Sequence, residues 1–554
     1  MKRFPFNSNG IPSGVRYNRV LADLPPTLSD LPTQGRFSRL STRLEGIRSR
    51  LETARFTSRD SAIVMAGVIL LYLAMTAFSA QRHLWHDELF TYYIAKSPSM
   101  TQFWQALRLD LNPPLSYLLV RGSLSVLGDN SYAVRFPFIV AFLVGSLCFY
   151  SFVSRRLRPA YGLLAMLVFW STPFFYLSNE ARPYGLIIGF FGMAMLAWQR
   201  AIEPGRSRVT LLMFALAVTG MMLSHFFTLF YITPFCLAEL LRWRRSRRFD
   251  LPLWAALVLP LLILCFYLAT IRSYQAALFP PSFQASPLKI VRFFYETLSP
   301  ESLALLLAIC AGLSMVFRRQ PPRTETKALM TSPEAAFTAG LLLIPVLINL
   351  AQMRSHGVTF PRYSAPAVFA YGLLLAFFLA MHTNANRLAA SVACCILLAW
   401  LAAANIVPPA LTVLRASRAN STASVRPPSI QQVRPDLPLV AASGLAFLEL
   451  DKYSDASTVS RLYYLTGGEL AIRYAHATLF EGFPVVKRYF PIRAHIEPYP
   501  QFVAEHPQFL VAGTPDYPED WLLRRLLDIH ATLQYLGDFP EGRGELYQVT
   551  MPGA

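Results

Sequence analysis

Repeated apolar stretches of membrane-spanning length constrain this chain more than any other feature. A spanning helix needs about 20 mostly apolar residues. Only 15% of the residues are charged, whereas an ordinary soluble domain has about 25%, so the composition excludes a soluble globular protein. We therefore expect an all-α polytopic membrane protein with about eleven spans. The apolar runs lie near residues 62–80, 136–154, 161–178, 184–199, 209–224, 226–241, 252–270, 302–317, 335–351, 364–381 and 388–408.

The positive charges predict how these spans are oriented. Residues 1–61 contain eleven Lys and Arg residues and no spanning run, so we expect a basic cytoplasmic tail. With the N-terminus inside, the short cytoplasmic loops contain more positive residues than the longer outer loops, as the positive-inside rule requires. An odd number of spans then places the C-terminus outside a cytoplasmic (inner) membrane. Topology accounts for the formal net charge of +19, so nucleic acid is not expected as a partner.

Three regions follow from this reading. We expect the tail over 1–61, a transmembrane domain over 62–408 with a long outer loop at 81–135, and a linker with an extracytoplasmic domain over 409–554. In the last region, Leu439–Ser443, Gln508–Gly513 and Glu545–Val549 are typical of short strands, and Glu519–His530 of a helix. This part is predicted to be a small α/β domain.

The first outer loop begins with two adjacent carboxylates, Asp87 and Glu88, directly after the first apolar run. Ionisable residues near membrane depth are expensive and are therefore functional candidates. Partial desolvation beside aromatic residues is expected to raise the pKa of Asp87 and strengthen it as a general base. The alternative is an ordinary solvated loop start, where any acidic pair would serve.

Arg–Tyr pairs occur at two other predicted outer boundaries. Glu180, Arg182 and Tyr184 lie within five residues, and Arg362 and Tyr363 are adjacent. The donor fork of arginine suits phosphate. The alternative for Glu180 and Arg182 is an ion pair that anchors helix ends.

Two further residues complete the set of candidates. His225 stands alone at a third outer boundary, where an interfacial histidine with satisfied hydrogen bonds is the commoner explanation. Arg135 closes the first outer loop.

The order of these motifs resembles the GT-C glycosyltransferases that use polyprenyl-phosphate sugars. The resemblance rests on Asp87-Glu88 after a first span, Asn112-Pro113-Pro114-Leu115, Arg135, and the run Asn179 to Tyr184. The nearest branch is the bacterial one that includes protein O-mannosyltransferases, aminoarabinose transferases and rhizobial lipopolysaccharide-core galacturonosyltransferases. Many of its members have His where this chain has Asn112.

The resemblance implies roles for the acidic residues. It implies that Asp87 is the general base, with Glu88 in the same motif. Glu180 would help to bind donor or acceptor.

The basic and aromatic candidates would contact the substrates: Arg135, Arg182, Tyr184, His225, Arg362 and Tyr363. The donor would be a polyprenyl-phosphate-linked sugar, and the acceptor a lipid, glycan or protein of the cell envelope. No cofactor is firmly implied, and a divalent metal is possible in the superfamily, although the sequence has no dedicated ligand cluster.

Two other classes remain open from sequence. A lipid or glycan transporter or flippase should have repeat symmetry and glycine-broken helices at the membrane midplane, which we do not find. A membrane scaffold without catalytic activity would not need carboxylates and Arg–Tyr pairs gathered at one face.

Overall fold

The structure is a computed structural model. It describes residues 58–108, 110, 112–267, 284–298, 300–317, 330–355, 357–411, 433–476, 481–514, 517, 520–538 and 544–553. The chain divides into two compact units, Met1–Ser61 and Ala62–Ala554. All but the last residues of the predicted basic tail lie outside the described residues, as does most of the predicted linker.

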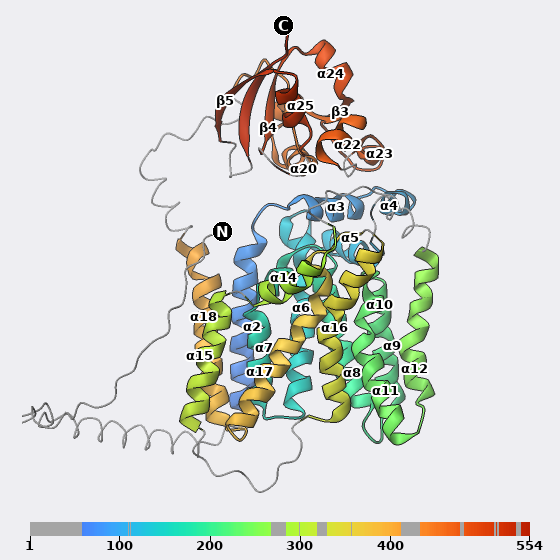
Figure 1. Cartoon of the computed structure of the whole chain (residues 1–554), viewed down its shortest axis with the longest axis vertical. Coiled ribbons are helices and arrows are strands. Elements are labelled where there is room, and N and C mark those ends of the chain that lie inside the picture. Colours follow the sequence, from blue (N-terminus) through green and yellow to red (C-terminus); the bar gives the residue numbers. More distant parts are fainter. Residues whose placement is uncertain are drawn as a thin grey trace, which may run out of the picture. The chain divides into compact units, whose positions relative to one another are not determined.

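A bundle of apolar helices forms most of the second unit (Figure 1). Five described helical segments are long and apolar enough to cross a membrane: Asp60–Ala77, Ser131–Ser154, Ser332–Arg354, Pro361–His382 and Arg387–Leu411. Side chains start several of these helices: Asn130 accepts a hydrogen bond from the backbone N–H of Ala133, and Asn386 accepts one from Leu388. The helices are α2 (Ser58–Ala80), α6 (Ser131–Ser154), α16 (Ser332–Arg354), η5 with α17 (Pro361–Val368 and Phe369–His382) and α18 (Arg387–Asn405).

Two further apolar runs form bent pairs of helices. Helix α7 (Pro159–Trp170) turns by 87° into the 3₁₀ helix η2 (Pro173–Asn179), and α14 (Pro287–Thr297) turns by 60° into α15 (Pro300–Phe317). Pro173 and Pro300 lack the N–H that would continue the preceding helix. Counting each pair as one span gives up to seven spans within the described residues.

The expected count of about eleven spans is not confirmed. The other apolar helices of the described chain are short or contain polar residues, because prolines and turns divide the remaining runs. They are α5 (Leu115–Leu127), α8 (Tyr184–Ala201), α9 (Arg208–Met222), α10 (Thr228–Tyr231), α11 (Thr233–Ser246), α12 (Leu251–Val258) and η3 (Leu259–Tyr267).

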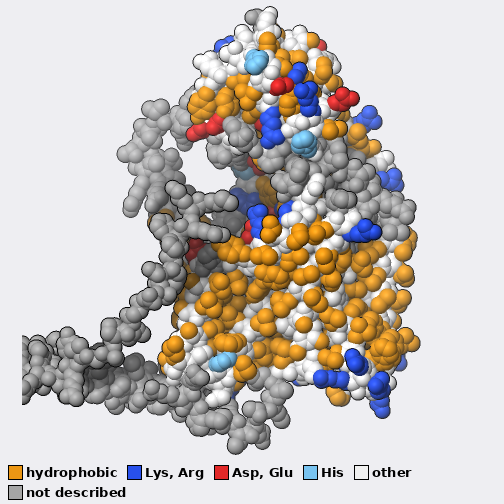
Figure 2. Space-filling view, viewed as in Figure 1, with side chains coloured by type: hydrophobic (Ala, Val, Ile, Leu, Met, Phe, Trp, Pro, Cys, Tyr) orange, Lys and Arg blue, Asp and Glu red, His pale blue; other side chains and the backbone are white. Residues whose placement is uncertain are grey.

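The surface of the bundle has the apolar character expected in lipid. Figure 2 shows hydrophobic side chains covering the visible face of the helices. Leu70, Leu374 and Met315, for example, are 66%, 46% and 75% exposed. Lys and Arg side chains gather at one end of this face, and the arginines at the end of α11, Arg244 to Arg248, are exposed. Exposed apolar side chains are favourable against lipid, and exposed Lys and Arg side chains are favourable at the membrane surface.

Helices α6 and α8 approach closely through glycines, which positions one wall of the site. A Cβ atom on Gly192 of α8 would lie 2.6 Å from the carbonyl oxygen of Gly145 on α6. Only glycine permits this approach of two backbones. The contact fixes the position of α8, which begins at Tyr184, two residues after Arg182.

The C-terminal part contains a six-stranded sheet with the order β3-β2-β1-β4-β6-β5. Strands β1 to β4 are parallel, and β6 pairs antiparallel with both β4 and β5. The three predicted strands correspond to β1, β4 and β6, and the predicted helix to α25, so the α/β prediction is confirmed. The strands are β1 (Leu439–Ala441), β2 (Leu462–Thr466), β3 (His495–Pro498), β4 (Gln508–Gly513), β5 (Thr532–Asp538) and β6 (Glu545–Thr550).

Short helices connect and flank these strands: α20 (Gly444–Tyr453), α21 (Ala456–Val459), α22 (Glu469–Ala475), α23 (Phe483–Val486), α24 (Tyr499–Glu505) and α25 (Leu522–Asp528).

The loop expected at 81–135 contains the short helices α3 (His86–Ala95) and α4 (Met100–Leu107) as well as α5. Helix α3 contacts α20: the Tyr93 hydroxyl donates to Asp451 over 3.1 Å, and the Leu84 N–H donates to the Tyr453 hydroxyl over 2.7 Å. These two bonds attach the loop 81–135 to helix α20.

Candidate active site

Helix α3 places its two neighbouring carboxylates in different environments. The helix begins after Trp85, whose backbone N–H donates to Glu88 over 3.2 Å. Consecutive helical residues point about 100° apart. Glu88 is fully buried, whereas the side chain of Asp87 is 20% exposed. Of the two, only Asp87 can meet a substrate.

Glu88 and Arg135 form a buried ion pair. Arg135 donates from Nε to Oε1 over 2.8 Å and from Nη2 to Oε2 over 2.6 Å, and both side chains are 0% exposed. Arg135 also donates to the carbonyl oxygen of Ala80, while Glu88 accepts from the backbone N–H of Ala181 over 2.8 Å. This geometry argues against the expected substrate-contacting roles of Glu88 and Arg135, because neither has an accessible atom. Both instead join α3, α6 and the end of α2 to the turn before α8.

Asp87 lies between two guanidinium groups. Its Oδ2 is 3.3 Å from Nη2 of Arg362 and 3.6 Å from Nε of Arg182. Arg182 also donates to the carbonyl oxygen of Asp87 over 3.3 Å. The three side chains come from α3, the turn before α8 and the start of η5, and the structure thus brings together the predicted base and two predicted phosphate ligands.

These cations control the ionisation of Asp87. Burial alone would raise the pKa of its carboxyl, but Arg182, the hydrogen bond from His86 and Arg362 together hold the pKa well below its usual range. The expectation of a raised pKa for Asp87 is therefore wrong. Desolvation does raise the pKa, but the two arginines, which are distant in sequence, lower it by more.

Glu180 has the opposite behaviour. It follows η2 and is 4% exposed. Burial raises the pKa of its carboxyl to about 7; Arg362 opposes the rise, and Glu88 and Asp87 add to it. Near neutral pH, this group is present both as an acid and as a carboxylate, so it can donate or accept a proton.

Aromatic rings surround Arg362. Its guanidinium carbon lies 4.8 Å from the ring centre of Phe360 and 5.8 Å from those of Tyr184 and Trp85. Such cation–π contacts hold a charged group in a partly dry site while leaving its N–H donors for other partners. Arg362 thus contacts Tyr184, the tyrosine of the other Arg–Tyr pair.

His225 and Tyr363 lie beside the same rings. The ring of His225 is 5.6 Å from that of Tyr184 and 5.8 Å from that of Tyr363. Burial, followed by Arg182 and Arg362, lowers the pKa of His225 to about 3. The imidazole is consequently neutral at physiological pH, as expected of an interfacial histidine without an acidic partner.

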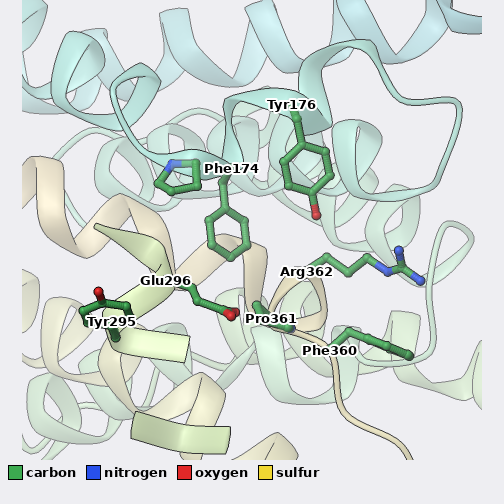
Figure 3. A pocket seen from close by; sticks show the side chains of 8 residues that line it. Phe174, Tyr176, Tyr295, Glu296, Phe360, Pro361 and Arg362 are labelled. Atoms are coloured by element: carbon green, nitrogen blue, oxygen red, sulfur yellow. The ribbon is translucent and has the colours of Figure 1, made fainter. Parts of the chain in front are cut away.

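A cavity of about 480 Å³ reaches Arg362. Its walls are formed by η2, by the end of α14 with Tyr295 and Glu296, and by the segment Phe360 to Arg362. In Figure 3 the Arg362 side chain extends away from Glu296 and over the Phe360 ring. A ligand in this space would meet mostly apolar walls, with the guanidinium of Arg362 and the carboxylate of Glu296 as the charged groups.

The site can now be compared with known proteins. Residues 111–269 match a family model described as dolichyl-phosphate-mannose-protein mannosyltransferase. The crystal structure of ArnT from Cupriavidus metallidurans in the apo state superimposes with a TM-score of 0.53 at 12% identity. That match covers 89% of this chain and 98% of the other. The fold of this chain is therefore similar to that of ArnT.

A second ArnT structure and the curated proteins complete the comparison. The Cupriavidus metallidurans ArnT bound to undecaprenyl phosphate has a TM-score of 0.50 at 12% identity, covering 88% of this chain and 98% of that one. No curated protein matches the chain.

Sequence reasoning missed one acidic member of this candidate site. Asp110 accepts a hydrogen bond from the Tyr117 hydroxyl over 2.5 Å and lies 4.0 Å from Nη1 of Arg182. Asn112 also donates to Asp110, over 3.1 Å. The spacing Asp-x-Asn-Pro-Pro could have indicated it, since the prolines that turn the chain fold Asp110 back toward Arg182.

Among the described residues, no group of three His, Cys, Asp or Glu side chains could hold a metal ion. Asp87 lies instead beside two cations, Arg182 and Arg362, so this donor set does not fit a divalent metal.

Proposed function

We propose that this protein is an integral membrane glycosyltransferase that moves a sugar from a polyprenyl-phosphate donor to a cell-envelope acceptor. The observation that carries the proposal is the position of Asp87, 3.6 Å from Arg182 and 3.3 Å from Arg362, which itself lines an amphipathic cavity. A base beside two phosphate-binding groups is the minimal apparatus for displacing a phosphate with an acceptor hydroxyl.

The comparisons support the chemical class of the donor. The matched family is named for transfer from dolichyl-phosphate mannose, and the similar ArnT structure has undecaprenyl phosphate bound. Arginine forks bind phosphate oxygens in pairs. In this chain Arg362 and Arg182 would bind the donor phosphate, with Tyr184 and Tyr363 beside it.

The proposed reaction is a single displacement. The acceptor oxygen or nitrogen forms a bond to the anomeric carbon while the bond from that carbon to the phosphate oxygen breaks. The acceptor proton moves to the carboxylate of Asp87, and polyprenyl phosphate leaves with the bonding electron pair, balanced by the arginines. Attack opposite the leaving group inverts the anomeric centre.

Donor binding would also activate the base. In the ligand-free site the two arginines depress the pKa of Asp87, which makes its carboxylate a poor proton acceptor. A phosphate among those arginines would compensate their charge and raise the pKa of Asp87. The base would then become effective only when the donor is present.

Glu180 would take a supporting role. Its carboxyl lies near the same arginines and has a pKa of about 7. In the neutral form it can donate a hydrogen bond to a sugar or phosphate oxygen without adding negative charge beside Asp87.

The charge pattern supports a location for the reaction. We propose a multi-pass protein of the cytoplasmic membrane with a cytoplasmic N-terminus, and with the site and the C-terminal α/β domain on the periplasmic or outer side. Membrane lipids would surround the bundle. The envelope lipid, glycan or protein that receives the sugar would approach from that outer side.

Mass spectrometry of cell-envelope glycans tests the proposal. Cells with the protein should contain a glycan or glycolipid one sugar larger than cells that lack it, and the Asp87→Asn variant should behave as the deletion does. Identical envelope glycans in all three strains would contradict a transferase function.

A further inference from the structure

A second cavity, of about 420 Å³, lies on the other side of η2. Its floor contains the buried residues Met75, Trp170 and Asn179, and its mouth contains the more exposed Trp400 and Asn405 near the end of α18. Both α2 and α18 belong to candidate spans, so the mouth opens on a surface that would face lipid.

Helix η2 forms a wall shared by the two cavities. Pro173 and Tyr176 line both, while Phe174 lines only the cavity of Arg362 and Phe175 lines only the second. A 3₁₀ helix has about three residues per turn, so successive side chains point about 120° apart and Phe174 and Phe175 line different cavities. The wall ends at Glu180, beside the proposed reaction centre.

The second cavity is polar but uncharged. None of the described residues that line it is an acid or a base. The hydroxyl groups of Ser171 and Thr172 donate to carbonyl oxygens of Val168 and Phe169, each over 2.8 Å, and Asn405 donates to that of Leu401 over 3.0 Å. The hydroxyl oxygens of Ser171 and Thr172 can still accept hydrogen bonds, and the amides of Asn179 and Asn405 can both donate and accept.

Acceptor oxygens beside aromatic rings suit a hydroxyl-bearing ligand. Sugar hydroxyls donate hydrogen bonds, and the apolar C–H face of a sugar ring packs on Trp and Tyr side chains such as Trp400 and Tyr176. A phosphate is disfavoured here, because no cation lines the described cavity, in contrast with the cavity of Arg362.

From this geometry we infer that the second cavity binds the uncharged, hydroxyl-bearing part of a membrane-borne acceptor, so that donor and acceptor enter on opposite sides of η2. The inference rests on the proposed function, because it assigns the acceptor of the same transfer. Trp400 and Asn405 would contact the acceptor, and η2 would separate it from the donor until both reach the end at Glu180.

Photolabelling of the full-length protein in lipid nanodiscs tests this assignment. One probe is an alkyl β-glucoside with a diazirine beside the headgroup, and the other is the matching alkyl phosphate. We expect the glucoside to label peptides covering 170–179 and 400–409, and the phosphate to label the peptide that contains Arg362.

Variants connect the labelling to the cavity. Trp400→Ala combined with Asn405→Leu should reduce glucoside labelling about fivefold, the effect of losing roughly 1 kcal/mol of ring packing and hydrogen bonding. Phosphate labelling should stay unchanged, which shows that the variant is folded. Trp243→Ala, which removes a 46% exposed tryptophan of α11, is the matched control and should change neither.

Two results would overturn the inference. Glucoside labelling that is equal in the parent and the double variant would exclude this cavity as the binding place. Competition by soluble maltose as effective as that by unlabelled alkyl glucoside would assign the cavity to a soluble saccharide and not to a membrane-borne one.

Failure of the phosphate probe at Arg362 would instead contradict the proposed donor, independently of the glucoside result. If the double variant is not recovered in membranes, Asn405→Leu alone should lower glucoside labelling and Trp400→Phe should largely preserve it.

Discussion

At the scale of single residues, the two adjacent carboxylates have different environments, because Glu88 is paired in the interior whereas Asp87 is 20% exposed beside two arginines. Glu88 has two strong hydrogen bonds from Arg135, so its charge is fully compensated. Asp87 has looser contacts, at 3.3 and 3.6 Å, with arginines that a phosphate can attract away. A carboxylate that accepts a proton needs the looser contacts of Asp87 and not the fully paired environment of Glu88.

Replacement of Asp87 by Asn should abolish sugar transfer with little effect on folding. The substitution is nearly isosteric but removes the proton acceptor, and loss of a general base typically costs about 10²- to 10⁴-fold in rate. The turnover rate of purified protein is the measurement, with Asp129→Asn as the control, since Asp129 is 44% exposed and pairs with Lys96. Transfer at the parental rate by Asp87→Asn would contradict the assignment and make Glu180 the next candidate.

Replacement of Arg362 or Arg182 by Ala should weaken donor binding. Each lost charge-assisted hydrogen bond to phosphate costs about 1.5–3 kcal/mol, so the dissociation constant for undecaprenyl phosphate should rise about 10- to 150-fold. Arg434→Ala is the matched control because this side chain is 43% exposed and pairs with Asp436, away from the candidate site. Unchanged binding by both variants would count against the phosphate role.

The raised pKa of Glu180 predicts a pH-dependent stability. The folded protein holds this proton up to pH about 7, whereas the unfolded chain releases it near 4.5. The folded state is thus favoured at low pH, and this contribution to stability is lost as the pH rises from about 4.5 to 7. Thermal unfolding midpoints from pH 5 to 8 should therefore fall less in Glu180→Gln than in the parent. The control is Glu301→Gln, which changes an exposed residue and should show the same fall in unfolding midpoint as the parent. If Glu180→Gln also shows the parental fall, burial does not raise the pKa of Glu180.

At the scale of elements, a few contacts between distant segments build the site. The buried Glu88–Arg135 pair joins α3, α6, the end of α2 and the turn at Ala181. The bend of 87° between α7 and η2 then places Glu180 at the end of a broken helix instead of inside a continuous span. The arrangement of these elements sets the distances at Asp87.

Breaking the buried pair should affect stability before catalysis. Glu88→Gln leaves Arg135 with an uncompensated buried charge, which typically costs about 3–5 kcal/mol. We expect a lower unfolding midpoint and reduced abundance in membranes. The double substitution Glu88→Gln with Arg135→Gln should recover part of that loss, because no charge remains buried.

The alternative outcome is informative for Glu88. If Glu88→Gln is as stable as the parent yet inactive, then Glu88 acts in the chemistry and not in positioning.

The sequence predicted the parts of the site better than their arrangement. The types and order of Asp87, Arg182 and Arg362 were sufficient to propose a base and a phosphate clamp, because such groups are rare beside apolar runs. Which of two adjacent carboxylates is buried depends on how α3 packs, and Arg362 lies 275 positions from Asp87. Local patterns contain no information about either.

At the scale of the whole molecule, the apolar runs predicted the helical bundle, but the number of spans depends on breaks. Pro173 turns one run through a right angle, and Pro287 begins a helix that ends at a second bend. The apolar content of a run does not predict such turns, because the sequence of a broken helix is as apolar as that of a straight one. The C-terminal sheet was more predictable, since its strands are short and bounded by Pro and Gly.

Reporter fusions test the predicted topology. A reporter fused after Arg245 should be active on the cytoplasmic side, and one fused after Pro435 on the opposite side, because the positive loops anchor the first segment inside. Reporters on the same side in both fusions would exclude an odd number of spans between these points.

The long sequence separation within the site has a consequence for its biosynthesis. Glu88 finds Arg135 and Ala181 within 47 and 93 positions, so this scaffold can assemble while most of the chain is still on the ribosome. Arg362 follows Asp87 by 275 positions, which corresponds to about 14–55 s at 5–20 residues per second. The nascent protein therefore inserts its proposed base well before its full phosphate clamp, and a chain that stops short of residue 362 has the scaffold without a complete site.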